Sequence, residues 1–369
     1  MKAGIVTICD TENMGNRLQN YALQRALSRY AEDVVTIKNK PRLESKLANL
    51  KQGSVLADSA ALNRLLGKPR KAKLLQFNQK YLSASRRCYW CNEPDVSIAP
   101  EDACDIYCAG SDQIWNPNFY RSEMFNYLGF TSRDTAFAYA ASFGIVQIPP
   151  HHQEAVRNGL NHLKYISVRE AAGKKIVEEL TGRTDVQVLV DPTMLLTAGE
   201  WSEILKQPAA PLPERYLLTY FLGSVSQSRK DAIAHLAADR DCQVIDLMDP
   251  GSPFHVIGPD EFLYLIDHAD AVCTDSFHGS VFSFLFQRPL AIFSRISPDG
   301  SHSDMGSRLK TFADTFCLDH CIATQDRLPQ IPETADYSSG MEVLKSERAK
   351  ASAFLDQVFS RAKAVEAEI

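Results

Sequence analysis

Short apolar segments alternate with segments of helical periodicity along this chain, and this alternation restricts the fold more than any other feature of the sequence. Strands that alternate with helices pair in parallel and are connected by right-handed crossovers. The chain is therefore predicted to be an α/β protein built on parallel sheets. In its second half, strand-like and helix-like runs follow one another at 216–222, 227–239, 242–247, 259–267, 271–274, 278–286 and 290–293.

The segment 207–213 divides this pattern into two parts. It contains three prolines in seven residues, which is typical of a linker. A chain of 369 residues is long enough for two domains that each bury a core. We predict two Rossmann-like domains facing a cleft, with ligands beyond the carboxyl ends of the strands. The predicted parts are an N-terminal domain at 1–206 with a helical insertion at 42–81, a C-terminal domain at 207–339, and a helix at 340–369 that packs back on the N-terminal domain.

The charge and hydropathy of the chain limit its expected location and partners. A formal net charge of −5 gives no general attraction to nucleic acid. The apolar runs are shorter than the roughly 20 residues that a membrane-spanning helix needs, and the N-terminus has no signal-peptide pattern. We therefore expect a cytoplasmic protein. The basic run 68–73, followed by Arg86 and Arg87, indicates either a solvated helical face or peripheral contact with an anionic partner at the inner face of the membrane.

The cysteines fit the same compartment. There are nine, an odd number, which suits reduced thiols better than a set of disulfides. The spacings of Cys88 to Cys91 and of Cys104 to Cys108 also suit zinc. The second pair lies in a predicted strand, however, where residues i and i+4 are about 13 Å apart. We therefore expect plain thiols and no metal site.

The segment from Thr274 to Gly279 has the sequence TDSFHG and joins a predicted strand to a predicted helix. Ser276 is expected to cap the helix, and Gly279 lets the backbone approach a ligand closely. The start of a helix attracts an anion, which would favour the protonated form of His278 and suit it to general-acid catalysis. The alternative is an ordinary capped helix with a histidine in its first turn.

Several motifs, taken together and in order, resemble those of the polysaccharide pyruvyl transferase family. The longest has the sequence GSDQIWNP and starts at Gly110, and the TDSFHG segment contains the last of them. The resemblance covers about 300 residues of the chain and leaves 42–81 and the C-terminal tail unmatched. The matching segments are 13–16, 18–23, 110–117, 141–144, 167–170, 191–192 and 276–279.

The resemblance implies a glycosyltransferase-B-like fold and a phosphoenolpyruvate donor, with no metal or cofactor. Such an enzyme moves the pyruvyl group onto hydroxyls of a sugar in a cell-surface polysaccharide or its precursor and forms a pyruvate ketal. His278 matches the histidine proposed as the acid, and Arg169 matches an arginine thought to contact the donor together with segment 276–279. The family also has a basic residue after the next strand, for which Arg295 and Arg308 are equal candidates. Arginine suits this role because its planar fork binds carboxylate and phosphate at two points.

The N-terminal domain is expected to hold the acceptor, free or lipid-linked. Asn13, Asn16 and Gln19 follow the first strand, where their amides can bind sugar hydroxyls. Asp112 can accept a proton from an attacking hydroxyl, and Trp115 offers an apolar face to a sugar ring. The alternative is that the two asparagines cap a helix and that Asp112 and Trp115 fix a turn.

Two other functions remain open at this stage. A nucleotide-sugar-dependent glycosyltransferase has the same architecture, with Arg169 and His278 at a diphosphate. A non-catalytic carbohydrate-binding protein would use the acceptor residues alone. The sequence contains neither a Gly-x-Gly-x-x-Gly motif after a strand nor a Walker loop, so nicotinamide and nucleoside-triphosphate chemistry lack their usual sequence support.

Overall fold

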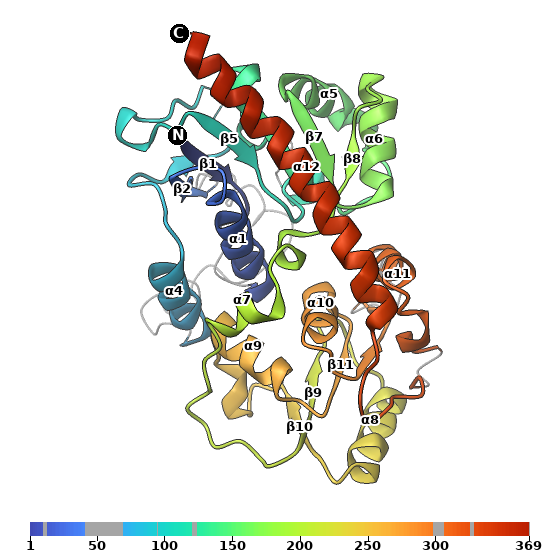
Figure 1. Ribbon diagram of the computed structural model, residues 1–369. Helices are drawn as coiled ribbons and strands as arrows, with labels where there is room; N and C mark the ends of the chain where they lie inside the picture. Colours follow the sequence, from blue (N-terminus) through green and yellow to red (C-terminus); the bar gives the residue numbers. More distant parts are fainter. Residues whose placement is uncertain are drawn as a thin grey trace. The chain divides into compact units, whose positions relative to one another are not determined.

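The chain divides into two compact units, which are described separately. A computed structural model describes residues 1–9, 13–40, 69–93, 95–119, 124–297, 306–324 and 328–368 (Figure 1). The first unit contains Met1–Leu195 and Ala349–Ile369, and the second contains Leu196–Arg348. Of the insertion expected at 42–81, residues 42–68 lie outside the described residues, and the remainder forms helix α4 (Pro69–Tyr81).

The first unit is built on a six-stranded sheet in which every neighbouring pair of strands is parallel, in the order β2-β1-β5-β6-β7-β8. The predicted parallel α/β architecture is confirmed for this unit. A separate two-stranded parallel pair joins β3 (Asn39–Lys40) to β4 (Tyr89–Trp90). The strands of the large sheet are β1 (Lys2–Val6), β2 (Asp33–Thr36), β5 (Ile106–Ala109), β6 (Ala136–Ala141), β7 (Tyr165–Val168) and β8 (Gln187–Val188).

Local signals set the ends of the helices in the first unit. Helix α1 (Met14–Leu27) begins at Asn13, whose side chain accepts a hydrogen bond from the Gly15 N–H and so satisfies an otherwise unpaired donor. Helix α6 (Ala171–Thr181) ends at Gly182, whose φ of 72° is the left-handed conformation that glycine adopts without strain. Between them in the chain lies α5 (Gln153–His162).

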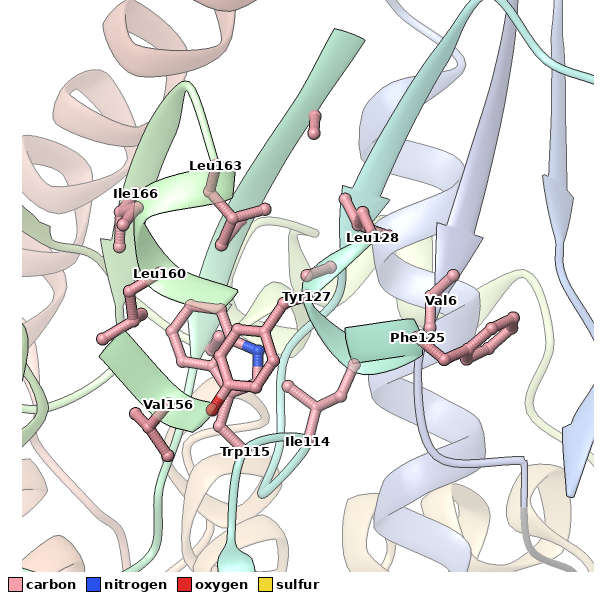
Figure 2. Packing of buried hydrophobic residues seen from close by; sticks show 14 of the residues in the cluster. Val6, Ile114, Trp115, Phe125, Tyr127, Leu128, Val156, Leu160, Leu163 and Ile166 are labelled. Carbon is pink, nitrogen blue, oxygen red and sulfur yellow. The ribbon is translucent and has the colours of Figure 1, made fainter. Parts of the chain in front are cut away.

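A cluster of large apolar side chains fills the core between the sheet and α5. Trp115 and Tyr127 are fully buried, and their rings stack with centroids 5.2 Å apart and planes 14° apart. Figure 2 shows Val156 and Leu160 of α5 beside this pair. Burial of aromatic rings is the largest favourable contribution available to a core of this size, so this cluster anchors α5 to the sheet.

Gly159 of α5 lies directly against the Tyr127 ring. A Cβ atom at this position would lie 2.3 Å from Tyr127 Cγ, and that ring is fully buried and stacked on Trp115. We therefore expect Gly159→Ala to lower the free energy of unfolding by about 1–3 kcal/mol, although alanine is the better helix former. Urea denaturation measures this difference. Gly199→Ala is the matched control, because a Cβ atom there would meet only Thr197 Oγ1, at 3.8 Å. Equal stabilities of the two variants would contradict the close packing of Gly159 against the Tyr127 ring.

The second unit contains a four-stranded sheet with all strands parallel, in the order β10-β9-β11-β12. Its strands are β9 (Tyr216–Tyr220), β10 (Gln243–Asp246), β11 (Ala271–Thr274) and β12 (Leu290–Ile292). Its helices are α7 (Ala198–Ser202), α8 (Gln227–Asp239), α9 (Pro259–Asp267), α10 (Phe277–Leu285) and α11 (Gly306–Thr315). The alternation of strands and helices predicted for this half is confirmed.

The boundary between the units differs from the expected position at residue 206. It falls between Leu195 and Leu196, before the proline-rich segment. The reason is apolar packing: Trp201 of α7 is fully buried and lies edge-on against Phe282 of α10, with centroids 4.9 Å apart. A proline-rich composition indicates a break in secondary structure, but the side chains that precede it decide where the compact unit begins.

The last helix, α12 (Ser338–Glu368), contributes to both units. Its residues up to Arg348 belong to the second unit, so the expected boundary at 339 is also displaced. From Ala349 onward the helix belongs to the first unit, where Phe354 packs against Tyr139 at 6.4 Å and Phe359 stacks on Tyr30 at 5.1 Å. None of the helices in the described part of the chain is both long and apolar enough to cross a membrane.

Candidate functional site

In the second unit, polar residues gather where β11 ends and α10 begins. Ser276 caps α10, as predicted, because its Oγ accepts a hydrogen bond from the Gly279 N–H at 3.3 Å. Thr274 Oγ1 accepts a hydrogen bond from the Ser276 N–H and donates one to the Tyr220 carbonyl at 2.5 Å. A Cβ atom on Gly279 would lie 2.8 Å from Thr274 Oγ1, so glycine is required for this close turn.

His278 lies in the first turn of α10, with 8% of the residue exposed and its ring nearly perpendicular to that of Phe277 at 5.3 Å. The first N–H groups of a helix carry partial positive charge, and that charge favours an anion at this end of α10. A histidine beside such an anion is favoured in its protonated form. His278 thus lies in the first turn of the helix that the TDSFHG segment predicted.

The two candidate arginines occupy different positions in the second unit. Arg295 follows β12, and its Nη2 donates a hydrogen bond to the Asp275 carbonyl at 3.2 Å, directly before the cap of α10. Arg308 is partly buried near the start of α11, which packs on α10 through Phe312 and Phe277 at 5.8 Å. The structure thus ties Arg295 to the strand end that carries the TDSFHG motif.

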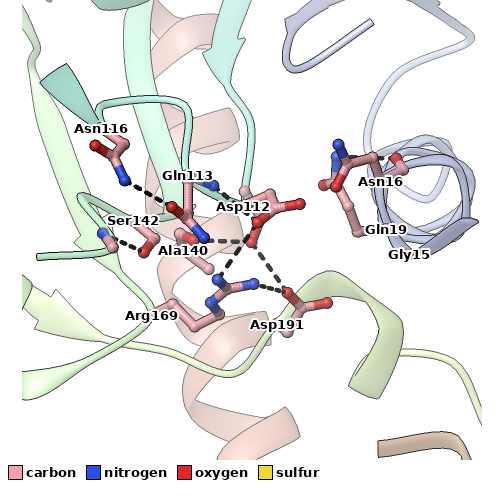
Figure 3. Close-up of polar contacts among 12 residues, drawn as sticks. Gly15, Asn16, Gln19, Asp112, Gln113, Asn116, Ala140, Ser142, Arg169 and Asp191 are labelled. Atoms are coloured by element: carbon pink, nitrogen blue, oxygen red, sulfur yellow. Dashed lines mark hydrogen bonds and ion pairs between the residues drawn. The ribbon is translucent and has the colours of Figure 1, made fainter. Parts of the chain in front are cut away.

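In the first unit, Arg169 lies among three carboxylates. Its Nη1 is 2.7 Å from Asp191 Oδ2, its Nη2 is 3.6 Å from Asp112 Oδ1, and its Nε is 3.7 Å from Glu170 Oε2. Figure 3 shows the guanidinium directed at Asp112 and Asp191. Burial by itself would lower the pKa of this guanidinium, but the carboxylates outweigh it and raise the pKa above the ordinary value. One guanidinium is therefore surrounded by three carboxyl groups.

The carboxylates around Arg169 are held by neighbouring hydroxyl and amide groups. Asp191 Oδ1 accepts hydrogen bonds from the Thr193 N–H at 3.0 Å and the Thr193 hydroxyl at 2.7 Å. Its Oδ2 also accepts from the Ser111 hydroxyl at 3.3 Å, and Glu170 Oε1 accepts from the Ser142 hydroxyl at 2.6 Å. Buried charges persist only when they are paired and hydrogen-bonded in this way. Asp191 also caps the 3₁₀ turn Pro192–Met194.

Asp112 has an unusual backbone conformation. Its φ of 65° is left-handed, and its carbonyl accepts a hydrogen bond from the Ser142 N–H at 2.9 Å. Aspartate tolerates this conformation better than most residues, and such positions often occur at functional sites. Figure 3 shows Asn16 and Gln19 of α1 on the side of the helix that faces Asp112. The structure therefore brings three of the predicted acceptor residues together.

The other two acceptor candidates have structural positions. Asn13 caps α1, which is the alternative considered from the sequence. Trp115 is fully buried in the core, and its indole N–H donates a hydrogen bond to the Asn126 carbonyl at 3.0 Å. The prediction that Trp115 offers its face to a sugar ring is therefore wrong. Its place in a motif beside Asp112 suggested the site, but the ring stacks on Tyr127 instead.

The structure also describes the cysteines that the sequence offered as zinc ligands. Burial raises the pKa of Cys104 to about 12, and it also raises the pKa of Cys108 well above the ordinary value of a thiol. Both side chains are therefore protonated and unreactive at neutral pH. Over the described ranges, no three residues of the His, Cys, Asp and Glu types are placed to hold a metal ion together.

The fold and these two polar clusters define a two-unit α/β protein with polar side chains gathered at the ends of its parallel strands, where ligands bind in sheets of this kind. The family model for polysaccharide pyruvyl transferases matches residues 13–297, which is most of the chain. The chain belongs to the polysaccharide pyruvyl transferase family. The family resemblance noted from the motifs is thereby confirmed.

Comparison with solved structures gives distant matches. A protein from Listeria monocytogenes assigned as a UDP-N-acetylglucosamine 2-epimerase has a TM-score of 0.48 and 10% identity, covering 93% of this chain and 94% of that one. The UDP-GlcNAc 2-epimerase of Methanocaldococcus jannaschii has a TM-score of 0.46 and 10% identity, and the match covers 94% of this chain and 99% of that one. The E. coli ADP-heptose lps heptosyltransferase II has a TM-score of 0.30 and 12% identity, and the match covers 95% of this chain and 99% of that one. No curated protein sequence matches the chain, so its family assignment rests on the family model.

Proposed function

We propose that this protein transfers the pyruvyl group of phosphoenolpyruvate to two hydroxyls of a sugar in a polysaccharide or its precursor, forming a pyruvate ketal. Membership of the polysaccharide pyruvyl transferase family supports the reaction class. The observation that carries the donor assignment is the arrangement at the start of α10. There His278 lies in the first helical turn, and Arg295 is bonded to the residue before the cap.

The donor fits this end of the second unit by charge. Phosphoenolpyruvate carries a carboxylate and a phosphate on a compact body, and both groups bind the start of a helix and an arginine fork well. We assign Arg295 to the donor, with Arg308 as the second candidate. An anion bound here would hold His278 in its protonated form, which is the form that a general acid needs.

The proposed chemistry needs no metal or cofactor. His278 donates its proton to the methylene carbon of phosphoenolpyruvate, which leaves an oxocarbenium-like carbon next to the phosphate oxygen. A sugar hydroxyl attacks this carbon and loses its proton. The C–O bond to the phosphate then breaks and inorganic phosphate leaves. Loss of phosphate leaves an oxocarbenium carbon; a second hydroxyl of the same sugar attacks it, gives its proton to the released phosphate and closes the ketal.

The acceptor side of the proposal belongs to the first unit. We assign Asp112 as the base that accepts the hydroxyl proton, and Asn16 and Gln19 as the amides that orient the sugar. The family resemblance gave Arg169 a donor contact. Its three carboxylate neighbours favour a different role, in which Arg169 holds Asp112 in place.

The location of the reaction is part of the same proposal. We place it in the cytoplasm, at the inner face of the membrane when the acceptor is lipid-linked. Helix α4 supports peripheral contact of this kind, because the sequence of Pro69–Tyr81 has four basic residues and no acidic one. Basic side chains near an anionic lipid surface contribute about 1 kcal/mol each.

Thermal melting with phosphoenolpyruvate and with a panel of nucleotide sugars tests the donor. A ligand that binds only the folded protein stabilises it by about 2.7 kcal/mol at a hundredfold excess over its Kd. We expect this stabilisation with phosphoenolpyruvate, and we expect Arg295→Gln and His278→Ala to reduce it. A shift with a nucleotide sugar alone would replace the proposal by a glycosyltransferase. Binding of sugars with no response to either donor would indicate a non-catalytic carbohydrate-binding protein.

A further inference from the structure

Asp275 is a buried carboxylate at the end of β11 that the motif analysis did not single out. Its side chain has no exposed surface. Its Oδ1 accepts a hydrogen bond from the Leu222 N–H at 2.7 Å, and its Oδ2 accepts one from the Gly223 N–H at 2.9 Å. Both donors belong to the loop after β9, the neighbouring strand. The carboxylate at the end of β11 therefore accepts hydrogen bonds from two N–H groups that follow the end of β9.

This loop is the first strand-to-helix connection of the second unit. In parallel α/β units, the backbone N–H groups of the first such connection commonly bind the phosphates of a nucleotide. Here these N–H groups already have partners. Those of Leu222 and Gly223 donate to Asp275, and that of Ser224 donates to the Ile296 carbonyl at 2.8 Å. Space is also lacking: a Cβ atom on Gly223 would lie 2.5 Å from the Ile296 oxygen and 2.6 Å from Arg295 Cγ. The three N–H groups of 222–224 are therefore unavailable to a diphosphate, and the Ile296 backbone and the Arg295 side chain lie close against this turn.

On its other side, Asp275 contacts the loop after β12. Its Oδ2 lies 3.6 Å from Arg295 Nε, and its carbonyl accepts a hydrogen bond from Arg295 Nη2 at 3.2 Å. The arginine side chain is only 16% exposed, so these contacts restrict its direction. A two-point contact of this kind fixes a guanidinium in a way that a lysine ammonium would not reproduce.

We propose that Asp275 is a positioning residue that fills the phosphate-binding loop of the second unit and fixes Arg295 beside the start of α10, so that the unit accepts a compact carboxylate–phosphate anion and excludes a nucleoside diphosphate. This inference rests on the proposed function, because it names the donor class of the same site. Asp275 itself has no contact with the donor. It acts through Arg295 and through the loop that it closes.

A double-mutant cycle measures whether Asp275 acts through Arg295. Phosphoenolpyruvate and UDP are titrated by calorimetry into the full-length wild type, Asp275→Asn, Arg295→Gln and the double variant. We expect each single change to weaken phosphoenolpyruvate binding by on the order of tenfold, and the double variant to bind no more weakly than Arg295→Gln. We expect no UDP binding to the wild type. Arg295→Lys, which leaves Asp275 in place, is expected to show a similar loss and is used if Asp275→Asn does not fold.

The control replaces a carboxylate of the same kind at the opposite end of the same sheet. Asp270 also accepts a hydrogen bond from a backbone N–H, that of Tyr216, and pairs with Arg215 at 2.6 Å. Asp270→Asn is expected to leave phosphoenolpyruvate binding unchanged.

The possible results separate this inference from the proposed function. Full binding by both Asp275→Asn and Arg295→Lys, or additive losses in the double variant, would overturn the positioning role. UDP binding to the wild type would overturn the exclusion of nucleotides. A wild type that binds neither compound would contradict the proposed function itself and, with it, this inference.

Discussion

His278→Gln is expected to reduce the rate of pyruvyl transfer by about 10²–10⁴-fold, because glutamine keeps a polar side chain but its amide is too weak an acid to protonate the methylene carbon. The change lies at the start of α10 and leaves the Ser276 cap intact, so the melting temperature should change little. The measurement is release of inorganic phosphate from phosphoenolpyruvate in the presence of a sugar acceptor that supports turnover by the wild type.

A second histidine of the same unit provides the control for this experiment. His268 stacks on Tyr264 at 3.9 Å, and its side chain is 44% exposed. His268→Gln is expected to keep the wild-type rate. Wild-type turnover by His278→Gln would rule out His278 as the acid, and an equal loss in both variants would point to an indirect effect on the fold.

Arg169→Met is expected to lower the stability of the first unit by about 3–5 kcal/mol, because it leaves three buried carboxylates without the cation between them. Methionine has a similar length, so the loss comes mainly from charge. Urea unfolding followed by fluorescence measures it in a Trp201→Phe background, since Trp90 and Trp115 both belong to the first unit. Arg169→Lys keeps the charge without the fork geometry and should recover part of the loss.

An exposed cation of the same unit separates this effect from a general loss of charge. Lys175 pairs with Glu179 at 3.7 Å, with 73% of the lysine side chain exposed. Lys175→Met is expected to change stability by less than about 0.5 kcal/mol, as is usual for surface ion pairs. If Arg169→Met were as stable as this control, the three carboxylates would not depend on the arginine.

Much of the fold could be predicted because its signals are local. The helix predicted at 227–239 has those bounds in the structure, since Ser226 caps it. The helix predicted at 259–267 is also confirmed, because proline is favoured at the first position of a helix and is excluded from its interior. The unit boundaries were not predictable in the same way, because they depend on which partner Trp201 packs against.

The candidate site shows the same division between local and distant contacts. Ser276 could be predicted because a cap and the N–H that it accepts from lie three residues apart. The pairing of Arg169 with Asp112 and Asp191 could not, because these residues come from three separate strand ends. Trp115 was misassigned because a motif gives the order of residues and not the direction of a side chain.

The division of α12 between the two units has a consequence for synthesis on the ribosome. The first unit needs Phe354 and Phe359, which are translated only after the whole second unit. At about 5–20 residues per second, the apolar partners Tyr30 and Tyr139 stay uncovered for on the order of ten seconds or more in the nascent chain. The unit that begins the chain is therefore the last to be completed, and during that interval it is the part most in need of a chaperone.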